Sequence, residues 1–153
     1  MEQLDAKDIE ILSILQEDAT LTTKELASKV HLSTTPVFER VKRLEREGYI
    51  RKYAAILDAD KLGKGFIVYC SVRLLRMGKD TAEDFVSKVK GIPEVTECYN
   101  ISGEYDYLMK VHAPNMKYYQ QFLINVIGTI GSVGSVQSTF VMQEIKQSYS
   151  LSL

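Results

Sequence analysis

Apolar residues in the first third of the chain recur in short blocks at the three- and four-residue spacing of helices. The first block, which predicts a helix over residues 5–16, consists of Leu4, Ile11, Leu12 and Leu15. Asp5 is expected to cap this helix, with Asp8 in its first turn, where the helix dipole favours negative charge. Thr22, with Glu25 three residues later, is a capping-box sequence and predicts a second helix that ends near residue 30.

A third helix is predicted over residues 33–47. Ser33 is its expected cap, and Pro36 falls in the first turn, where a missing N–H costs nothing. Its apolar stripe consists of Val37, Val41 and Leu44. Gly48 stops it as a left-handed cap, and residues 49–57 then form extended chain. Two short helices, a tight turn, a third helix and a strand ribbon predict a winged helix-turn-helix.

The second half of the chain has a different rhythm. Strands are expected at 66–75, 94–101, 106–113 and 136–145, helices at 80–90 and 115–127, and a glycine-marked loop at Gly128, Gly131 and Gly134. This order is βαββαβ, so the fold class is α+β: a winged helix-turn-helix over residues 1–60 and a ferredoxin-like domain over 61–153.

Both helices of a ferredoxin-like domain lie on one face of the sheet, so the other face is expected to be bare. Its predicted apolar occupants are Ile67, Tyr69, Leu75, Leu108 and Val141. Such a face predicts association with another subunit. Two small domains also gain stability from oligomerisation, because each buries a small fraction of its surface. We therefore expect at least a homodimer.

Charge is unevenly distributed. The net charge is −1, yet residues 40–52 carry six bases against two acids, a local charge of +4. For contact with DNA phosphates, a concentrated basic stripe matters more than the net charge of the whole chain.

The N-terminal part of the second motif helix enters the major groove in helix-turn-helix proteins. Hydroxyls and arginines there can meet base edges, while Lys42, Arg51 and Lys52 suit the DNA backbone. The predicted DNA-binding set is Ser33, Thr34, Thr35, Val37, Arg40, Lys42, Arg43 and Lys52. A solvated helix with Glu–Arg pairs is the alternative.

Residues 102–106, Ser-Gly-Glu-Tyr-Asp, join two strands of the second domain. Gly103 permits close approach to the backbone, exposed N–H groups suit a carboxylate, and Asp106 suits an ammonium group. These residues would complement a zwitterionic amino acid, with Tyr105 as a wall. By themselves these residues favour a polar hairpin, which is the commoner structure.

The segment Leu32–Ile50 resembles the recognition-helix region of the leucine-responsive/AsnC family of prokaryotic regulators. Leu57-Asp58 through Leu62-Gly63 resembles the hinge of that family, and Gly103–Asp106 resembles its effector-binding segment. The resemblance covers the whole chain. It implies promoter-DNA binding, dimers that often assemble into octamers, and a response to amino acids. It also favours a ligand loop over a plain hairpin; the implied effector set is Ser102, Gly103, Glu104, Tyr105, Asp106 and Thr139.

Other functions find less support in the sequence. It contains no phosphate loop, no nucleophile elbow and no metal-ligand spacing, so no enzyme, catalytic residue, metal or cofactor is expected. Cys70 and Cys98 lie in apolar runs and predict two buried thiols. No signal peptide or membrane helix is recognised, which favours the cytoplasm. Two alternatives stay open: an architectural DNA-coating protein without effector, and a ferredoxin-like ligand-binding or enzyme domain with an accessory helical module.

Overall fold

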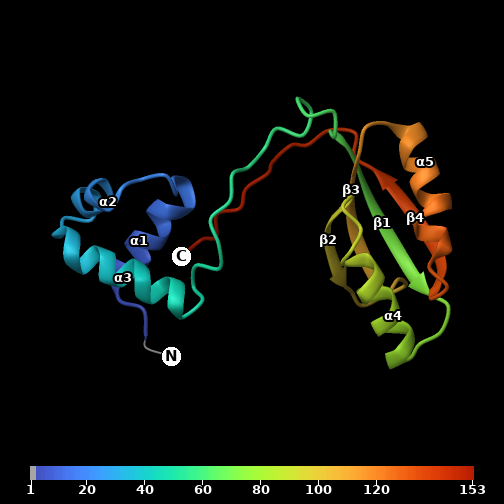
Figure 1. Cartoon of the computed structure of the whole chain (residues 1–153), viewed down its shortest axis with the longest axis horizontal. Helices are drawn as coiled ribbons and strands as arrows, with labels where there is room; N and C mark the ends of the chain where they lie inside the picture. Colours follow the sequence, from blue (N-terminus) through green and yellow to red (C-terminus); the bar gives the residue numbers. More distant parts are fainter. Residues whose placement is uncertain (1–2) are drawn as a thin grey trace. The chain divides into compact units, whose positions relative to one another are not determined.

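The computed structural model describes residues 3–153, which form two compact units. The first ends at Ile56 and takes in the C-terminal segment Lys146–Leu153; the second is Leu57–Ile145. In chain order the elements are α1 (Ala6–Glu17), α2 (Thr23–Lys29), α3 (Thr34–Arg46), β1 (Phe66–Leu74), α4 (Lys79–Val89), β2 (Val95–Asn100), β3 (Tyr107–Ala113), α5 (Met116–Asn125), the 3₁₀ helix η1 (Ile127–Thr129) and β4 (Val133–Phe140) (Figure 1). Three helices followed by βαββαβ confirm the predicted fold class.

The first unit is a three-helix cluster around a small apolar core. Its fully or nearly buried members are Ile11, Leu26, Ala27, Val30, Val37 and Leu44. Two of the three predicted N-terminal caps make the expected side-chain hydrogen bonds. Asp5 and Asp8 form a reciprocal capping box at α1, and Thr22 and Glu25 form one at α2. Such caps satisfy N–H groups that have no partner inside the helix.

The turn between α2 and α3 is tight. His31 has a φ of 54°, in the left-handed region that non-glycine residues seldom occupy. Ser33 is the N-cap residue of α3, as predicted, but its side chain makes no capping hydrogen bond. Gly48, one residue beyond the C-cap Glu47, has a φ of 80°, which confirms the expected left-handed stop.

The strand ribbon predicted after α3 is not formed in the described chain. Residues 51–57 are described throughout, and none of them belongs to a strand. A strand requires a hydrogen-bonded neighbour, and the strand pairings of the described chain do not include these residues. The first compact unit ends at Ile56 and includes Lys146–Leu153, whereas the division into residues 1–60 and 61–153 stays a prediction. The Gln16 side chain on α1 holds this returning segment, accepting the Leu151 N–H at 2.6 Å and donating to the Leu151 carbonyl at 3.1 Å.

The second unit is a four-stranded antiparallel sheet of order β2-β3-β1-β4. Alternate residues of β1, Val68, Cys70 and Val72, are fully buried. Phe85 of α4 and Tyr119 and Phe122 of α5 belong to the same core. Both helices therefore cover one face of the sheet, as expected. The Tyr119 hydroxyl lies 2.6 Å from Ser138 Oγ, so the polar tip of this buried ring has a partner.

The last strand lies earlier than predicted, at Val133–Phe140 instead of 136–145. Gly134, expected in a loop, belongs to β4. A Cβ there would come within 3.0 Å of the Leu74 carbonyl oxygen and of Leu75 Cα. This close approach coincides with the register shift between Arg73 and Leu74 in the β1–β4 pairing. Glycine at this position thus permits strand contact and does not mark a loop.

The opposite face of the sheet carries no helix. Ile67, Tyr69 and Leu108 are half-buried there, and Val141 continues past β4 with its N–H bonded to the Ile67 carbonyl. Leu75, also predicted on this face, follows the end of β1 and is exposed. The cysteine prediction is half right, because Cys70 is buried but Cys98, near the open edge of the sheet on β2, is exposed.

Candidate DNA-binding face and effector loop

The first turn of α3 is open to solvent. Ser33, Thr34 and Thr35 are all exposed, whereas Val37 and Leu44 are fully buried against the other two helices. The apolar stripe therefore turns the N-terminal hydroxyls of the helix outward. Val37 was predicted among the DNA-binding residues, and the structure corrects this prediction. A side chain inside the core cannot reach DNA while the unit stays folded.

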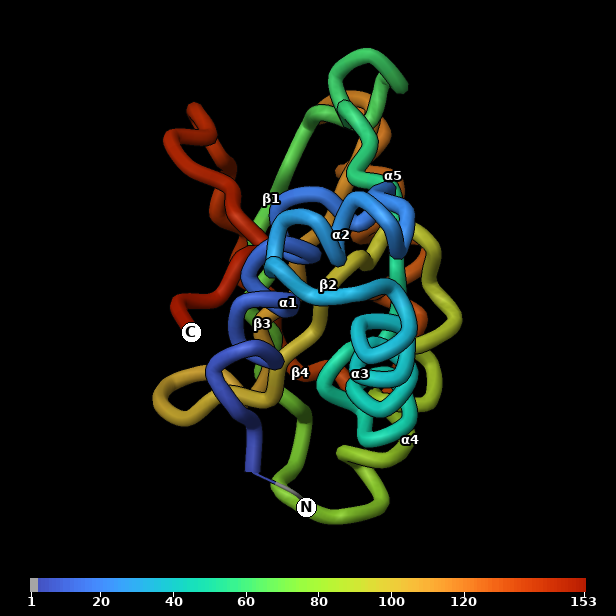
Figure 2. The backbone as a smooth tube through the Cα atoms, turned by 90° about the vertical axis from the view of Figure 1, so that its left-hand side faces the viewer, coloured from blue at the N-terminus to red at the C-terminus, as the bar shows by residue number. Residues whose placement is uncertain are grey.

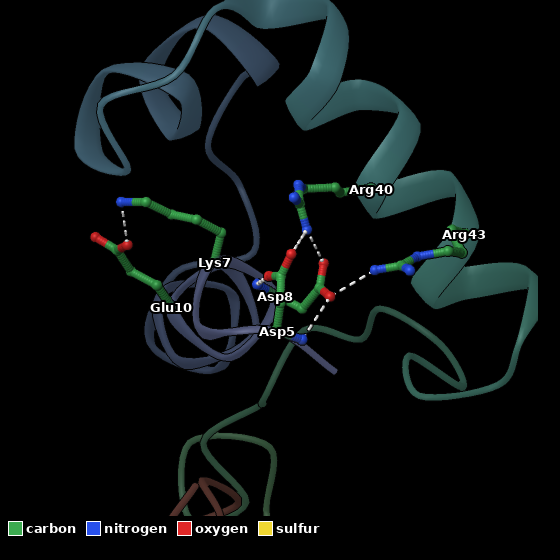
Figure 3. A network of polar contacts seen from close by, with 6 residues as sticks. All are labelled: Asp5, Lys7, Asp8, Glu10, Arg40 and Arg43. Atoms are coloured by element: carbon green, nitrogen blue, oxygen red, sulfur yellow. Dashed lines mark hydrogen bonds and ion pairs between the residues drawn. The ribbon is translucent and has the colours of Figure 1, made fainter. Parts of the chain in front are cut away.

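Arg40 and Arg43 point from α3 towards α1 (Figure 3). Arg40 Nη1 donates to Asp5 Oδ2 at 2.6 Å and to Asp8 Oδ1 at 2.7 Å. Arg43 Nη2 donates to Asp8 Oδ2 at 2.5 Å. The Asp8 side chain is fully buried, while those of Arg40 and Arg43 are 28% and 20% exposed. Two residues predicted to face DNA thus have carboxylate partners within their own domain.

Hydrogen bonding keeps Asp8 ionised. Burial by itself raises the pKa of this carboxyl, but the Asp5 N–H and the two guanidinium groups outweigh burial and lower it. The pKa of Asp5 is lowered by the Asp8 N–H and then by Arg40. The pKa of Arg40 is raised by Asp8 and then by Asp5. The cluster is charged at neutral pH.

The sequence contained a signal for this cluster that the dipole interpretation missed. Asp8 lies three, four and seven residues before Ile11, Leu12 and Leu15, and so falls on the apolar stripe of α1. A carboxylate on a core-facing stripe needs a buried partner. Lys7 is a second unpredicted contact: its ammonium donates to the Val30 carbonyl at 2.7 Å, at the C-cap of α2, just before the turn into α3.

The remaining basic candidates are accessible. The Lys42 side chain is 52% exposed and makes a surface pair with Glu45 at 2.7 Å. Lys52 is exposed and, within the described residues, makes no hydrogen bond or ion pair. Tyr53 donates to Glu45 at 3.0 Å, and burial followed by this bond raises its pKa to about 12. Exposed lysines on α3 and in the segment that follows it suit phosphate contact.

The loop between β2 and β3 stands at one end of the second unit (Figure 2). Gly103 has a φ of 124°, and no heavy atom lies within 4 Å of the place that a Cβ would take, so its backbone is open on that side. Asp106 Oδ2 accepts the Leu74 N–H at 2.7 Å, and the Asp106 N–H donates to the Val72 carbonyl at 2.9 Å. The Asp106 side chain is therefore anchored to β1 at the position of the bulge.

Arg73 of β1 holds the same loop and was not among the predicted residues. Its Nε donates to the Glu104 carbonyl at 3.0 Å, and its guanidinium lies 5.4 Å from the centre of the Tyr105 ring. Thr139 is not brought to the loop. It pairs with Tyr69, four residues along β1 from Arg73, a separation of about 13 Å at the rise of a strand.

Two hollows of the second unit are not lined by any residue of this loop. One, of about 500 Å³, lies between α4 and β2, with the buried Val89 and Tyr107 in its lining. A second, of about 270 Å³, lies at the start of α4, beside Gly131 and Ser132. Within the loop itself, residues 102–104 are exposed, and Tyr105 and Asp106 are half-buried.

An exposed helix turn with adjacent basic residues, joined to a separate sheet domain with an open loop, defines a DNA-binding protein of the helix-turn-helix class with its own ligand domain. Residues 4–51 match the family model "Winged helix-turn-helix DNA-binding", and residues 67–151 match "Lrp/AsnC ligand binding domain". The chain is 38% identical to the leucine-responsive regulatory protein of Klebsiella pneumoniae, over 97% of this chain and 90% of that protein.

Solved structures agree. A transcriptional regulator of Neisseria meningitidis, crystallised as a complex with L-Met, superposes with a TM-score of 0.94 at 38% identity, covering 98% of this chain and 97% of that one. An AsnC family transcriptional regulator from Agrobacterium tumefaciens gives 0.92 at 38% identity, covering 97% of each. The protein belongs to the Lrp/AsnC family of transcription regulators, which confirms the predicted resemblance and function class.

Two absences concern the part of the chain that the structure describes. Within residues 3–153, no three His, Cys, Asp or Glu side chains are grouped closely enough to hold a metal ion. Over the same residues, no helix has the length and apolar character needed to cross a membrane.

The acid sensitivity of the two units should differ. The pKa values of five carboxyls in the first unit are lowered by folding, those of Asp5, Asp8, Asp18, Glu25 and Glu45. In the second unit, the pKa of Asp84 is lowered, chiefly by its hydrogen bond with the Lys88 ammonium. Lowered pKa values mean that the folded state binds fewer protons than the unfolded state. Their stabilisation is complete above the ordinary values of 3.8 and 4.5 and is lost as the pH falls below them.

We therefore expect the first unit to unfold at a higher pH than the second. Backbone amide resonances of Val30 and Val111, followed by NMR through an acid titration, report the two units separately. The Val30 signal should move to its unfolded position first. Simultaneous loss of both signals, or earlier loss of Val111, would contradict the assignment of acid-labile stability to the first unit.

Proposed function

We propose that this protein binds promoter DNA through the first turn of α3 and adjacent lysines, and that a free α-amino acid at the 102–106 loop modulates this binding. The observation that carries the proposal is the exposed turn Ser33–Thr35 on a helix whose opposite stripe is buried. Its three hydroxyls are short donors and acceptors, suited to base edges in the major groove. Lys42 and Lys52 then contact phosphates, which position the protein without reading sequence.

The effector part of the proposal rests on the chemistry of the loop. Gly103 exposes backbone N–H groups that suit a carboxylate, and Asp106 offers one oxygen beyond the one that accepts the Leu74 N–H. Arg73, Glu104 and Tyr105 brace each other and form a wall. The solved relative from Neisseria meningitidis holds L-Met, a ligand of the proposed class. Thr139 belongs to this site only if another subunit supplies it.

Self-association completes the proposal. The helix-free face of the sheet presents Tyr69 and Leu108, half-buried in the single chain, beside exposed Tyr99. A second copy packed on this face would remove these side chains from water. We propose a homodimer that assembles further, with an octamer as the expected closed form, in the cytoplasm. An effector at a subunit boundary would alter the spacing of the recognition helices if it favours one assembly.

A DNA-coating protein without an effector is the second candidate function. It shares the same α3 surface, so the loop separates the two. A coat protein needs no ammonium acceptor in this loop. Asp106 has one carboxylate oxygen beyond the one that accepts the Leu74 N–H, and Gly103, with a φ of 124°, leaves the backbone of the same loop open. These two features support the sensing protein.

Substitutions at the two kinds of DNA contact should have different effects. Lys52→Ala should weaken binding to all sequences alike and lower the salt slope of the association constant by about one unit, because one phosphate contact is lost. Thr35→Val should weaken only selected DNA, by about 1–3 kcal/mol if its hydroxyl reads a base. Fluorescence titration over a range of salt concentrations measures both. Lys117→Ala, an exposed lysine on α5, is the charge-matched control. Unchanged affinity in both α3-side variants would remove this surface from the DNA interface.

Loss of the Asp106 charge should weaken effector binding. Asp106→Asn keeps an acceptor for the Leu74 N–H but loses the ion pair with an ammonium group, so we expect about a tenfold lower affinity. Calorimetric titration with the twenty amino acids measures it, with Asp80→Asn on the exposed start of α4 as control. Equal binding by wild type and Asp106→Asn would refute the ammonium role. A wild type that binds none of the panel would favour the coat protein.

A charge on the helix-free sheet face should break the dimer. Leu108→Glu would place an unpaired carboxylate in the proposed interface, where burial of a charge is costly. Light scattering should show a smaller particle, while circular dichroism reports whether the fold persists. Ile124→Glu, on an exposed position of α5, is the control and should leave the mass unchanged. The proposal fails if the wild type is a monomer at micromolar concentration.

A further inference from the structure

Asp8 makes hydrogen bonds on both sides of its buried carboxylate. Oδ1 accepts from Arg40, and Oδ2 accepts from Arg43 and from the Asp5 N–H at 3.0 Å (Figure 3). Its side chain has no exposed surface. An ion this deeply buried adds little net stability when compared with an apolar side chain of similar size, yet removal of one partner leaves an uncompensated charge. Net stability is therefore a weak explanation for a buried charge at this position.

The hydrogen bonds that Asp8 accepts from Arg40 and Arg43 bear on the orientation of α3. Arg40 and Arg43 are three residues apart, about one helical turn, and both end on the same carboxylate of α1. The apolar contacts of Val37 and Leu44 are non-directional and tolerate small rotations and shifts of a helix. Charge-assisted hydrogen bonds require defined distances and angles. Two of them, one turn apart, therefore restrict both the rotation of α3 about its axis and its tilt against α1.

The exposed turn Ser33–Thr35 lies one to two turns before Arg40 on the same helix. A rotation of α3 would move these hydroxyls away from the atoms they meet on DNA, because a helix transmits rotation along its length. We propose that Asp8 is a positioning residue for DNA recognition, which holds α3 through Arg40 and Arg43 in the orientation that presents Ser33–Thr35. This inference rests on the proposed DNA-binding function. It also assigns Arg40 and Arg43 to holding α3 against Asp8, and not to reading bases.

Three possible roles of Asp8 make different predictions for a variant without its charge. If Asp8 only stabilises the unit, its loss lowers the folded fraction and weakens all DNA equally. If it acts only as a negative charge near DNA, its loss strengthens all binding, since phosphate repulsion falls. If it positions α3, its loss weakens selected DNA and leaves unselected DNA equal or tighter. The ratio of the two affinities therefore isolates positioning from the other roles.

The test compares wild type with Asp8→Asn on two duplexes. One is selected by the wild-type protein from a random-sequence pool, and the other is the same sequence scrambled. We expect the affinity ratio to fall about tenfold, comparable to loss of one base contact, with scrambled DNA bound at least as tightly as by wild type. The salt slope should not fall, because no phosphate contact is removed. Glu17→Gln, an exposed acid on the same helix, removes the same charge and should keep the ratio.

Arg40→Lys provides a second test that keeps the charge but loses the forked guanidinium. It should reduce the ratio of the affinities for selected and scrambled DNA, and it should weaken base preference at all positions of the selected site. If Arg40 reads a base, the substitution would instead relax base preference at one position of the site only. That result would overturn the role of Arg40 in holding α3 against Asp8. If Asp8→Asn does not fold, as judged by its amide spectrum, the Arg40→Lys result decides whether the ion cluster positions α3.

An unchanged ratio in a folded variant refutes the positioning role and leaves the DNA-binding function intact. A wild-type protein that selects no duplex from the pool refutes the proposed function itself.

Discussion

One buried carboxylate links the helix that begins the fold to the helix that faces outward. Asp8 closes the capping box of α1 and at the same time receives two guanidinium groups from α3. A side chain with no solvent exposure cannot hold a charge without such partners. Among the described residues of the three-helix unit, six apolar side chains are fully or nearly buried, and their contacts are non-directional. The ion cluster adds directional contacts to a small core.

The second unit obtains its architecture from alternation along its strands. Val68, Cys70 and Val72 turn to the helices, and the residues between them turn to a face that no helix covers. At the end of this sheet, the bulge after Arg73 coincides with Gly134 on one side and Asp106 on the other. Close strand approach and the anchored loop therefore arise at the same position. The loop is braced from within but open outward, the condition for a site completed by a ligand or another subunit.

Much of the fold was predictable because local patterns and tertiary packing agree. Thr22 with Glu25, Gly48 after α3 and the stripe Val37, Val41, Leu44 each report helix ends or faces within a few residues of sequence. Errors arose where a residue's role depends on distant chain. Gly134 suggested a loop but permits contact with β1, and residues 51–57 have strand composition without a neighbouring strand.

The sequence by itself determined the fold class, the three helices of the first unit, the βαββαβ order of the second and the outward first turn of α3. These follow from periodicity, capping and turn preferences, which act over a few residues. Only the tertiary structure decided the partners of Arg40 and Arg43, the burial of Val37, the brace from Arg73, and the return of Lys146–Leu153 to the first unit. The physical reason is range. A charge in a sequence has a sign and a position on a helix, but its partner is whichever opposite charge the fold brings within hydrogen-bond distance. Here that partner lies more than thirty residues away.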